Sequence, residues 1–202
     1  MITGIFGLPG AGKSCFLAYL AQKALAGEAL FVGHRPFWTV PLTEFHKYER
    51  VYTNFPMRGA YQLNYDHLGT FDFSYSLILI DEIASLAFNR GWKNFGAEKV
   101  EFFTQHRHLH SDVIYCSQSY RNMDVTIREL TAQLMHIKKQ GDYTIVTPIS
   151  KSIKVEPTIE ERYTLDARLC SSKIKRKKYY HLFDSYTKKE LPENPAQEWG
   201  TI

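Results

Sequence analysis

Residues 7–14 have the residue types and the spacing of a phosphate-binding loop. They read GLPGAGKS and satisfy the pattern G-x-x-x-x-G-K-[ST] at every fixed position. Glycines let successive backbone N–H groups point into one concavity that binds anions, and the helix behind adds the positive end of its dipole. We predict that Lys13 reaches the β- and γ-phosphates of a nucleotide and that the Ser14 hydroxyl holds Mg²⁺. The predicted nucleotide contacts are Gly7, Leu8, Pro9, Gly10, Ala11, Gly12, Lys13, Ser14 and Cys15. The alternative is a glycine-rich turn that happens to precede a helix.

Two acidic residues, Asp81 and Glu82, follow an apolar run at 76–80. A run that is apolar on both faces is typical of a central strand in a covered parallel sheet. We expect this strand to lie next to the strand that precedes the phosphate loop, so that its carboxyl end faces the metal and the γ-phosphate. Asp81 would then hold Mg²⁺, and Glu82 would act as general base toward the attacking water. The alternative is a strand that ends in an acidic turn.

Other polar residues are candidates for contacts with the γ-phosphate. Gln118 follows an apolar strand predicted at 113–117, where its side chain can touch the γ-phosphate or the attacking water; otherwise it caps the next loop. A neighbouring subunit is expected to supply an arginine, because charge that develops on the phosphoryl oxygens needs a cation. The sequence does not decide among Arg90, Arg107, Arg121 and Arg128. Arg107 and Arg128 enter the predicted catalytic set with Lys13, Glu82 and Gln118.

The order of the predicted elements indicates an α/β fold. Strand and helix patterns alternate as far as residue 132, and strand-like stretches with turns at 140–142 and 150–151 follow. This order predicts a mostly parallel sheet that is extended by antiparallel strands at one edge. Strands are predicted at 2–6, 50–55, 76–80 and 113–117, and helices at 13–26, 96–110 and 122–132. Residues 30–49 are predicted to form an insertion with a short helical piece, and 59–75 a loop with a turn of helix.

Length and composition fit one globular domain, because 202 residues with an ordinary apolar fraction can bury a core. No run of eighteen apolar residues occurs, so we expect no membrane span within this chain. The N-terminus lacks the basic region of a signal peptide. The three cysteines, Cys15, Cys116 and Cys170, are far apart in sequence and indicate reduced thiols in a cytosolic protein.

Basic residues gather toward the C-terminus, although the net charge is only +4. Residues 166–191 carry eight Lys or Arg and three acids, whereas residues 1–165 are nearly balanced. The basic segment 173–178 is followed by two tyrosines, and three interpretations stay open. It contacts a nucleic-acid backbone, it lies near anionic lipid head groups, or it is a solvated hairpin.

Several of these segments together resemble the ATPase domain of the zonular occludens toxin family, which includes the assembly ATPase of filamentous phages. The resemblance rests on GLPGAGKS, the Tyr52-Thr53-Asn54 strand, LILIDE, a helix that ends in HRH, and DVIYCSQ. The later segments 163–167 and 180–186 also resemble the end of that domain. The similarity covers residues 1–187, which we predict to be a P-loop ATPase domain with a β-rich part at 134–187, followed by a tail at 188–202.

The resemblance implies a RecA-like, three-layer α/β/α fold of the FtsK/HerA type that binds ATP and Mg²⁺. It also implies a homo-oligomeric ring, often a hexamer, that moves or packages DNA, with phage DNA or phage assembly proteins as partners. Lys13, Ser14, Asp81, Glu82 and Gln118 take the roles given above. In the filamentous-phage members a membrane span typically follows the ATPase domain. Membrane association would therefore come from a region that this chain does not contain, with the ATPase in the cytoplasm.

Other functions stay open on the sequence. A soluble viral genome-packaging ATPase is the nearest alternative. A phosphotransferase would consume ATP only with a small acceptor, and a nucleotide-gated scaffold would bind without turnover, against which Glu82 argues. The absence of an N-K-x-D motif argues against a GTPase. Residues 84–95, with Gly91, Trp92 and Phe95, are a candidate loop for transmitting movement.

Overall fold

The computed structural model describes residues 1–34, 38–45, 47–84, 97–120, 125–154, 160–165 and 171–183. The predictions for Arg90, Arg121, Cys170, the segment 85–95 and the tail 188–202 lie outside these ranges. Within them, no helix is both long enough and apolar enough to cross a bilayer.

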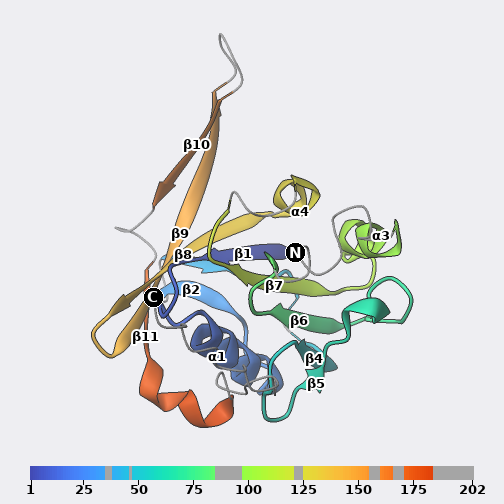
Figure 1. Ribbon diagram of the computed structural model, residues 1–202, viewed down its shortest axis with the longest axis horizontal. Coiled ribbons are helices and arrows are strands. Elements are labelled where there is room, and N and C mark those ends of the chain that lie inside the picture. The colour runs from blue at the N-terminus through green and yellow to red at the C-terminus, as the bar shows by residue number, and fades with distance from the viewer. Residues whose placement is uncertain are drawn as a thin grey trace, which may run out of the picture.

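A central sheet organises the chain (Figure 1). In the described residues it has nine strands in the order β10-β9-β8-β1-β7-β6-β4-β5, and β11 pairs with β9 beside that path. The strands from β8 to β5 run parallel, whereas β9 is antiparallel to β8, β10 and β11. This confirms the predicted parallel sheet with antiparallel additions toward the C-terminus. The strands are β1 (Ile2–Phe6), β4 (Arg50–Thr53), β5 (Tyr61–Gln62), β6 (Ser76–Ile80), β7 (Asp112–Ser117), β8 (Gln133–Gln140), β9 (Tyr143–Lys154), β10 (Glu160–Leu165) and β11 (Ser172–Lys175).

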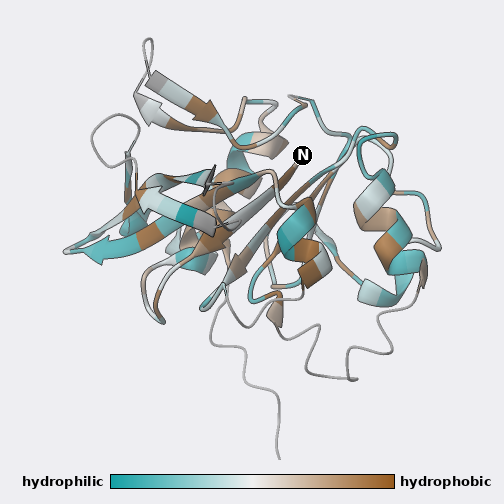
Figure 2. Ribbon diagram, turned by 90° about the horizontal axis from the view of Figure 1, so that it is seen from above, coloured by the Kyte–Doolittle hydropathy of each residue, from teal (hydrophilic) through white to brown (hydrophobic). Residues whose placement is uncertain are grey.

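Helices cover both faces of this sheet and make three layers. Helix α1 (Lys13–Leu25) lies on one face, and α3 (Ala97–Gln105) and α4 (Val125–Leu130) lie on the other (Figure 1). Because β1, β6 and β7 are buried on both faces, their residues alternate between two apolar clusters. Ile5 and Leu79 pack with α1, whereas Ile2 and Ile80 pack with α3 and α4. Figure 2 shows the hydrophobic residues gathered on these central strands.

Several predicted boundaries are wrong. The helix predicted at 96–110 ends at Gln105, and residues 106–110 form turns before β7 begins. The turn predicted at 150–151 does not form, because Ser150 and Lys151 pair with β10 and β9 therefore continues to Lys154. Among the described residues of 30–49, strands β2 (Phe31–His34) and β3 (Trp38–Pro41) form a hairpin, and no helix occurs.

The short elements carry the remaining connections. The loop predicted at 59–75 contains the two-residue strand β5 and the 3-10 turn η1 (Tyr65–His67). Two further 3-10 turns, η3 (Arg176–Lys178) and η4 (Tyr180–Leu182), follow β11. The turn predicted at 140–142 joins β8 to β9. Thr144, just after this turn, contacts the phosphate loop.

Candidate functional site

The phosphate loop joins β1 to α1, as its motif requires. Gly12, at the N-cap of α1, has a φ of 97°, in the left-handed region that favours glycine. The loop also needs glycine because neighbouring strands approach it closely. A Cβ atom at Gly7 would lie 2.4 Å from the carbonyl oxygen of Ile137 in β8, and one at Gly12 would lie 2.2 Å from Oγ1 of Thr144 in β9. The antiparallel extension thus packs directly against the loop.

Lys13 and Ser14 lie at the start of α1 and face the inside of the site. The Lys13 side chain is buried, and its ammonium donates to the carbonyl oxygens of Gly7 at 2.9 Å and Leu8 at 3.3 Å. The Ser14 hydroxyl donates to the Asp81 carboxylate. The structure therefore brings together two predicted metal ligands that are 67 positions apart in the chain.

Asp81 comes to the phosphate loop by a route that differs from the sequence prediction. We expected its strand, β6, next to β1, but β7 lies between them. The contact with Ser14 still forms because α1 packs over β4 and β6 and carries its first turn toward the end of β6. The strand adjacent to β1 is instead β7, the strand that Gln118 follows.

Burial sets the electrostatics of Asp81. Removal from water raises its pKa, and this effect exceeds the opposing effects of the Ser14 hydrogen bond and the nearby Lys13 ammonium. An additional cation beside this carboxylate would stabilise its ionised form.

Glu82 occupies an unusual backbone conformation. Its φ is 57°, which is uncommon for a residue with a side chain. Hydrogen bonds hold the backbone on both sides: Ile83 N–H donates to the Cys116 carbonyl at 2.8 Å, and Asp81 is held as described below. The Glu82 carboxylate accepts a long hydrogen bond, 3.4 Å, from the Ser117 hydroxyl at the end of β7. Strained backbone of this kind concentrates at functional sites.

Asn54 is a site residue that our residue-by-residue reasoning missed. Its Oδ1 accepts from the Asp81 N–H, and its Nδ2 donates to the Asp81 carbonyl, both at 2.7 Å. The side chain therefore fixes the backbone of the predicted metal ligand and, next to it, that of Glu82. The sequence did contain a signal for this role. Asn54 is a polar residue directly after the β-type segment at 50–53, and it belongs to the Tyr52-Thr53-Asn54 segment on which the family resemblance partly rests.

The remaining predicted catalytic residues lie in different places. Gln118 is exposed and directly follows β7, whose Ser117 carbonyl accepts from Gly7 N–H at 3.4 Å, so it lies at the phosphate-loop end of the sheet. The Arg128 guanidinium lies over the Tyr120 ring, 5.5 Å from its centroid. Within the described ranges, neither side chain forms a hydrogen bond with the phosphate loop.

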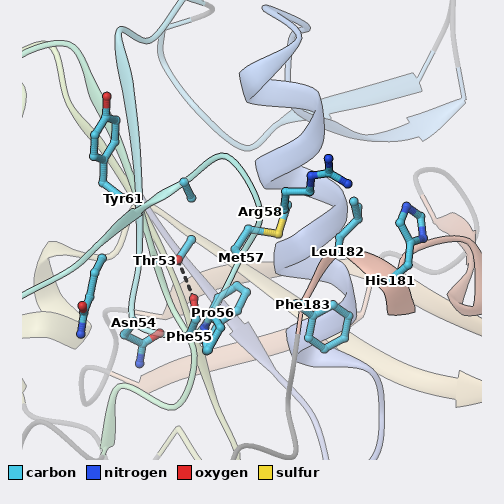
Figure 3. Close-up of a pocket in the computed structure, with 12 residues that line it drawn as sticks. Thr53, Asn54, Phe55, Pro56, Met57, Arg58, Tyr61, His181, Leu182 and Phe183 are labelled. Atoms are coloured by element: carbon cyan, nitrogen blue, oxygen red, sulfur yellow. Dashed lines mark hydrogen bonds between the residues drawn. The ribbon is translucent and has the colours of Figure 1, made fainter.

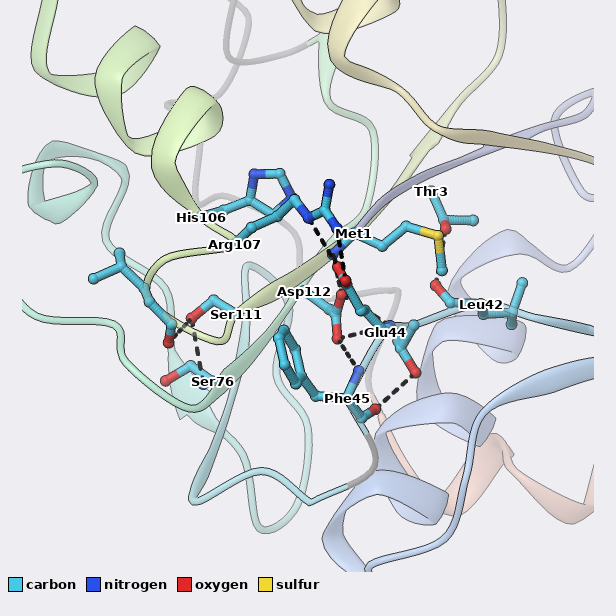
Figure 4. A network of polar contacts seen from close by, with 12 residues as sticks. Met1, Thr3, Leu42, Glu44, Phe45, Ser76, His106, Arg107, Ser111 and Asp112 are labelled. Atoms are coloured by element: carbon cyan, nitrogen blue, oxygen red, sulfur yellow. Dashed lines mark hydrogen bonds and ion pairs between the residues drawn. The ribbon is translucent and has the colours of Figure 1, made fainter.

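Arg107 lies at the opposite end of the sheet, where β1 and β7 begin, and Figure 4 shows it beside Glu44 and Met1. Its guanidinium pairs with the Glu44 carboxylate at 2.8 and 3.1 Å. The Glu44 N–H donates to Asp112, the fully buried first residue of β7, which also pairs with the N-terminal amine of Met1. Because β1 and β7 run parallel from this end, Arg107 is separated from its own phosphate loop by the length of β1, about 15 Å. Any contact with a phosphate would therefore be made to another subunit.

The two described cysteines are free and buried. Burial raises the pKa of Cys15 to about 11, and burial also raises the pKa of Cys116 well above its usual range. Both thiols are therefore protonated and serve as small packing groups beside the site.

The chain has the features of a RecA-like P-loop NTPase. A GLPGAGKS loop connects a strand to a helix, the sheet is mostly parallel and lies between helical layers, and an aspartate lies beside the Ser14 hydroxyl. The family model described as zonular occludens toxin (Zot) matches residues 54–190. The chain belongs to this family. No curated protein matches it.

Several solved structures are similar to this chain at low sequence identity. The N-terminal domain of zonular occludens toxin from Neisseria meningitidis is 18% identical, with a TM-score of 0.51 over 91% of this chain and 98% of that one. The flagellar accessory protein FlaH from Methanocaldococcus jannaschii is 13% identical, with a TM-score of 0.44 over 80% of this chain and 88% of that one. The genome packaging NTPase of Sulfolobus turreted icosahedral virus 2 is 8% identical, with a TM-score of 0.43 over 80% and 95%.

Proposed function

We propose that this chain is an Mg²⁺-dependent ATPase that powers virion assembly or DNA translocation. The observation that carries the proposal is the contact between Ser14 and Asp81, which places a carboxylate beside the phosphate loop. Lys13 binds the β- and γ-phosphates, and Glu82 takes a proton from the attacking water. Gln118, directly after β7, contacts the γ-phosphate or the attacking water. Residues 1–187 form the ATPase domain in this proposal.

The residues at the site fit a magnesium ion. Mg²⁺ prefers oxygen ligands, and the Ser14 hydroxyl and Asp81 carboxylate are adjacent oxygen donors at the first turn of α1. Burial disfavours the Asp81 charge, so a cation there would stabilise the ionised carboxylate. When bound, the ion neutralises charge on the phosphoryl oxygens.

The machine that we propose is a homo-oligomeric ring in the cytoplasm. Family membership and the position of Arg107 support it: this exposed arginine is far from its own phosphate loop, as a residue acting on a neighbouring subunit would be. Arg128 remains the second candidate. Phage DNA or phage assembly proteins are the proposed cargo, and membrane association would come from a region outside this chain. A viral genome-packaging ATPase is the alternative.

ATP hydrolysis by the wild type and by Glu82→Gln tests the proposal, with and without single- and double-stranded DNA. We expect the variant to bind ATP and to lose turnover by about 100-fold or more, because the water loses its general base. Glu101→Gln on α3, an exposed residue that bonds Gln105, is the matched control and should behave as the wild type. Stimulation by DNA would support a motor.

Two other results would replace the proposal. Phosphate transfer to a small acceptor, with no hydrolysis alone or with DNA, would indicate a phosphotransferase. Nucleotide binding without turnover in the wild type under all conditions would indicate a nucleotide-gated scaffold.

A further inference from the structure

The segment after β10 packs against the outer side of α1, and we call residues 172–183 the C-terminal strap. It consists of β11 and the turns η3 and η4 (orange to red in Figure 1). Midway, the Tyr179 ring packs edge-on against Tyr19 of α1, with centroids 5.3 Å apart. Lys173, within the basic segment, lies over the Tyr143 ring in β9. The basic segment 173–178 is therefore attached to the fold, through the buried Ile174 and the partly buried Arg176, while its four lysines are exposed.

The far end of the strap is attached to the loop after β4. Arg58 N–H donates to the Leu182 carbonyl at 3.1 Å, and Phe183 forms a β-bridge with Met57. Figure 3 shows these residues around a cavity of about 670 Å³, which also reaches Asn54. The strap thus spans α1 and ends beside the loop whose Asn54 holds Asp81.

The near end of the strap is in contact with the phosphate loop. The Arg176 carbonyl accepts from the Cys15 thiol at 3.6 Å, and the Arg176 Cδ atom lies 3.1 Å from the position of a Cβ on Gly12. On the same side, the Thr144 hydroxyl donates to the Ala11 carbonyl at 3.2 Å. Arg176 is therefore the basic residue of the strap that is placed against the nucleotide-binding loop.

The guanidinium of Arg176 is only partly satisfied. Its Nη2 donates to the Gly141 carbonyl, while its Nε is buried and has no hydrogen-bond partner among the described residues. The neighbouring acid, Asp142, pairs with Lys177 at 3.3 Å, and in the same described residues no carboxylate pairs with Arg176. A buried guanidinium N–H without a partner is costly, and an anion at this position would satisfy it.

Strand order decides which part of a nucleotide would meet Arg176. The phosphate loop follows β1; Asp81 lies on the β6 side of it, and Arg176 lies on the β9 side. A triphosphate with its γ-phosphate at Asp81 extends its nucleoside end toward the opposite side. We infer that Arg176 binds the α-phosphate of the nucleotide and so couples nucleotide binding to the C-terminal strap. This inference rests on the proposed function.

Equilibrium binding of ATP, ADP and inorganic pyrophosphate to the full chain tests the inference. Arg176→Gln should weaken ATP and ADP alike by about 10- to 100-fold, the effect of one charge-assisted hydrogen bond, and should leave pyrophosphate within about twofold because pyrophosphate has no α-phosphate. Lys177→Gln, the exposed neighbour, is the control and should bind all three ligands as the wild type does. Arg176→Lys keeps the charge and the alkyl stem beside Gly12, so it should fold as the wild type and lose about 3- to 10-fold for ATP and ADP.

The outcomes separate this inference from the proposed function. Wild-type affinity of both Arg176 variants for ADP would overturn the inference, and so would an equal loss for pyrophosphate, which indicates a general disruption of the loop. If Arg176→Gln does not fold, the Arg176→Lys result decides. Failure of the wild type to bind ATP, or unchanged binding in Lys13→Ala, would instead overturn the proposed function.

Discussion

Asn54→Ala is expected to reduce turnover strongly while leaving nucleotide affinity nearly unchanged. The substitution removes both hydrogen bonds to the Asp81 backbone, each of 2.7 Å. It leaves a partly buried N–H without its partner, so we expect the free energy of unfolding to fall by about 2 kcal/mol. Because these two hydrogen bonds go to Asp81 and not to the phosphate loop, the Kd for ATP should change by less than about threefold.

The effect on kcat follows from the backbone of Glu82. Its φ of 57° stores about 1–3 kcal/mol, and the hydrogen bonds of Asn54 help to maintain that conformation. Without these hydrogen bonds the Glu82 backbone relaxes to a more favourable conformation. The strain energy of about 1–3 kcal/mol must then be supplied during the reaction, when the carboxylate is positioned toward the water. At about 1.4 kcal/mol per tenfold change, kcat should fall by about 5- to 150-fold.

Phosphate-release kinetics, ATP titration and urea denaturation measure the three quantities separately. Asn64→Ala is the matched control, because that exposed asparagine bonds only the η1 turn, through the Asp66 N–H and the His67 ring; its kcat should equal that of the wild type. A purely structural role for Asn54 would lower the unfolding free energy but leave kcat unchanged well below the melting temperature. That result, or a loss of ATP affinity as large as the loss of kcat, would refute the reasoning.

Two further predictions concern packing and pH. Gly12→Ala should destabilise the protein by about 1–3 kcal/mol more than Gly10→Ala in urea denaturation, because both residues have positive φ but only at Gly12 does the new Cβ meet Thr144; equal losses would contradict the packing argument. Burial lowers the pKa of His106 from 6.5, so the unfolded state takes up a proton that the folded state does not, and the free energy of unfolding should fall as pH decreases below about 6.5. Between pH 7.5 and 5.5, His106→Gln should reduce the dependence of the unfolding free energy on pH, whereas His108→Gln, at an exposed histidine, should not. The same pH dependence in the wild type and both variants would exclude His106 as its source.

Much of the phosphate loop could be predicted from the sequence because its requirements are local. The eight residues of GLPGAGKS are contiguous, and the strand before them and the helix after them have their own apolar patterns. The same holds for β6, whose five buried residues are followed at once by Asp81. Boundaries that depend on pairing were missed: β9 continues through Ser150 because β10 pairs with it.

What the sequence by itself determined is a set of local patterns: a loop with the phosphate-binding motif, the acidic pair after a buried strand, and an α/β fold with a β-rich C-terminal part. Only the tertiary structure decided that β7 separates β1 from β6, and that Asn54 and Arg176 lie beside residues far from them in the chain. The physical reason is that a local pattern fixes which segments become strands, whereas the order of strands depends on how connecting helices pack across the sheet. Side-chain contacts between distant segments exist only after that packing is set.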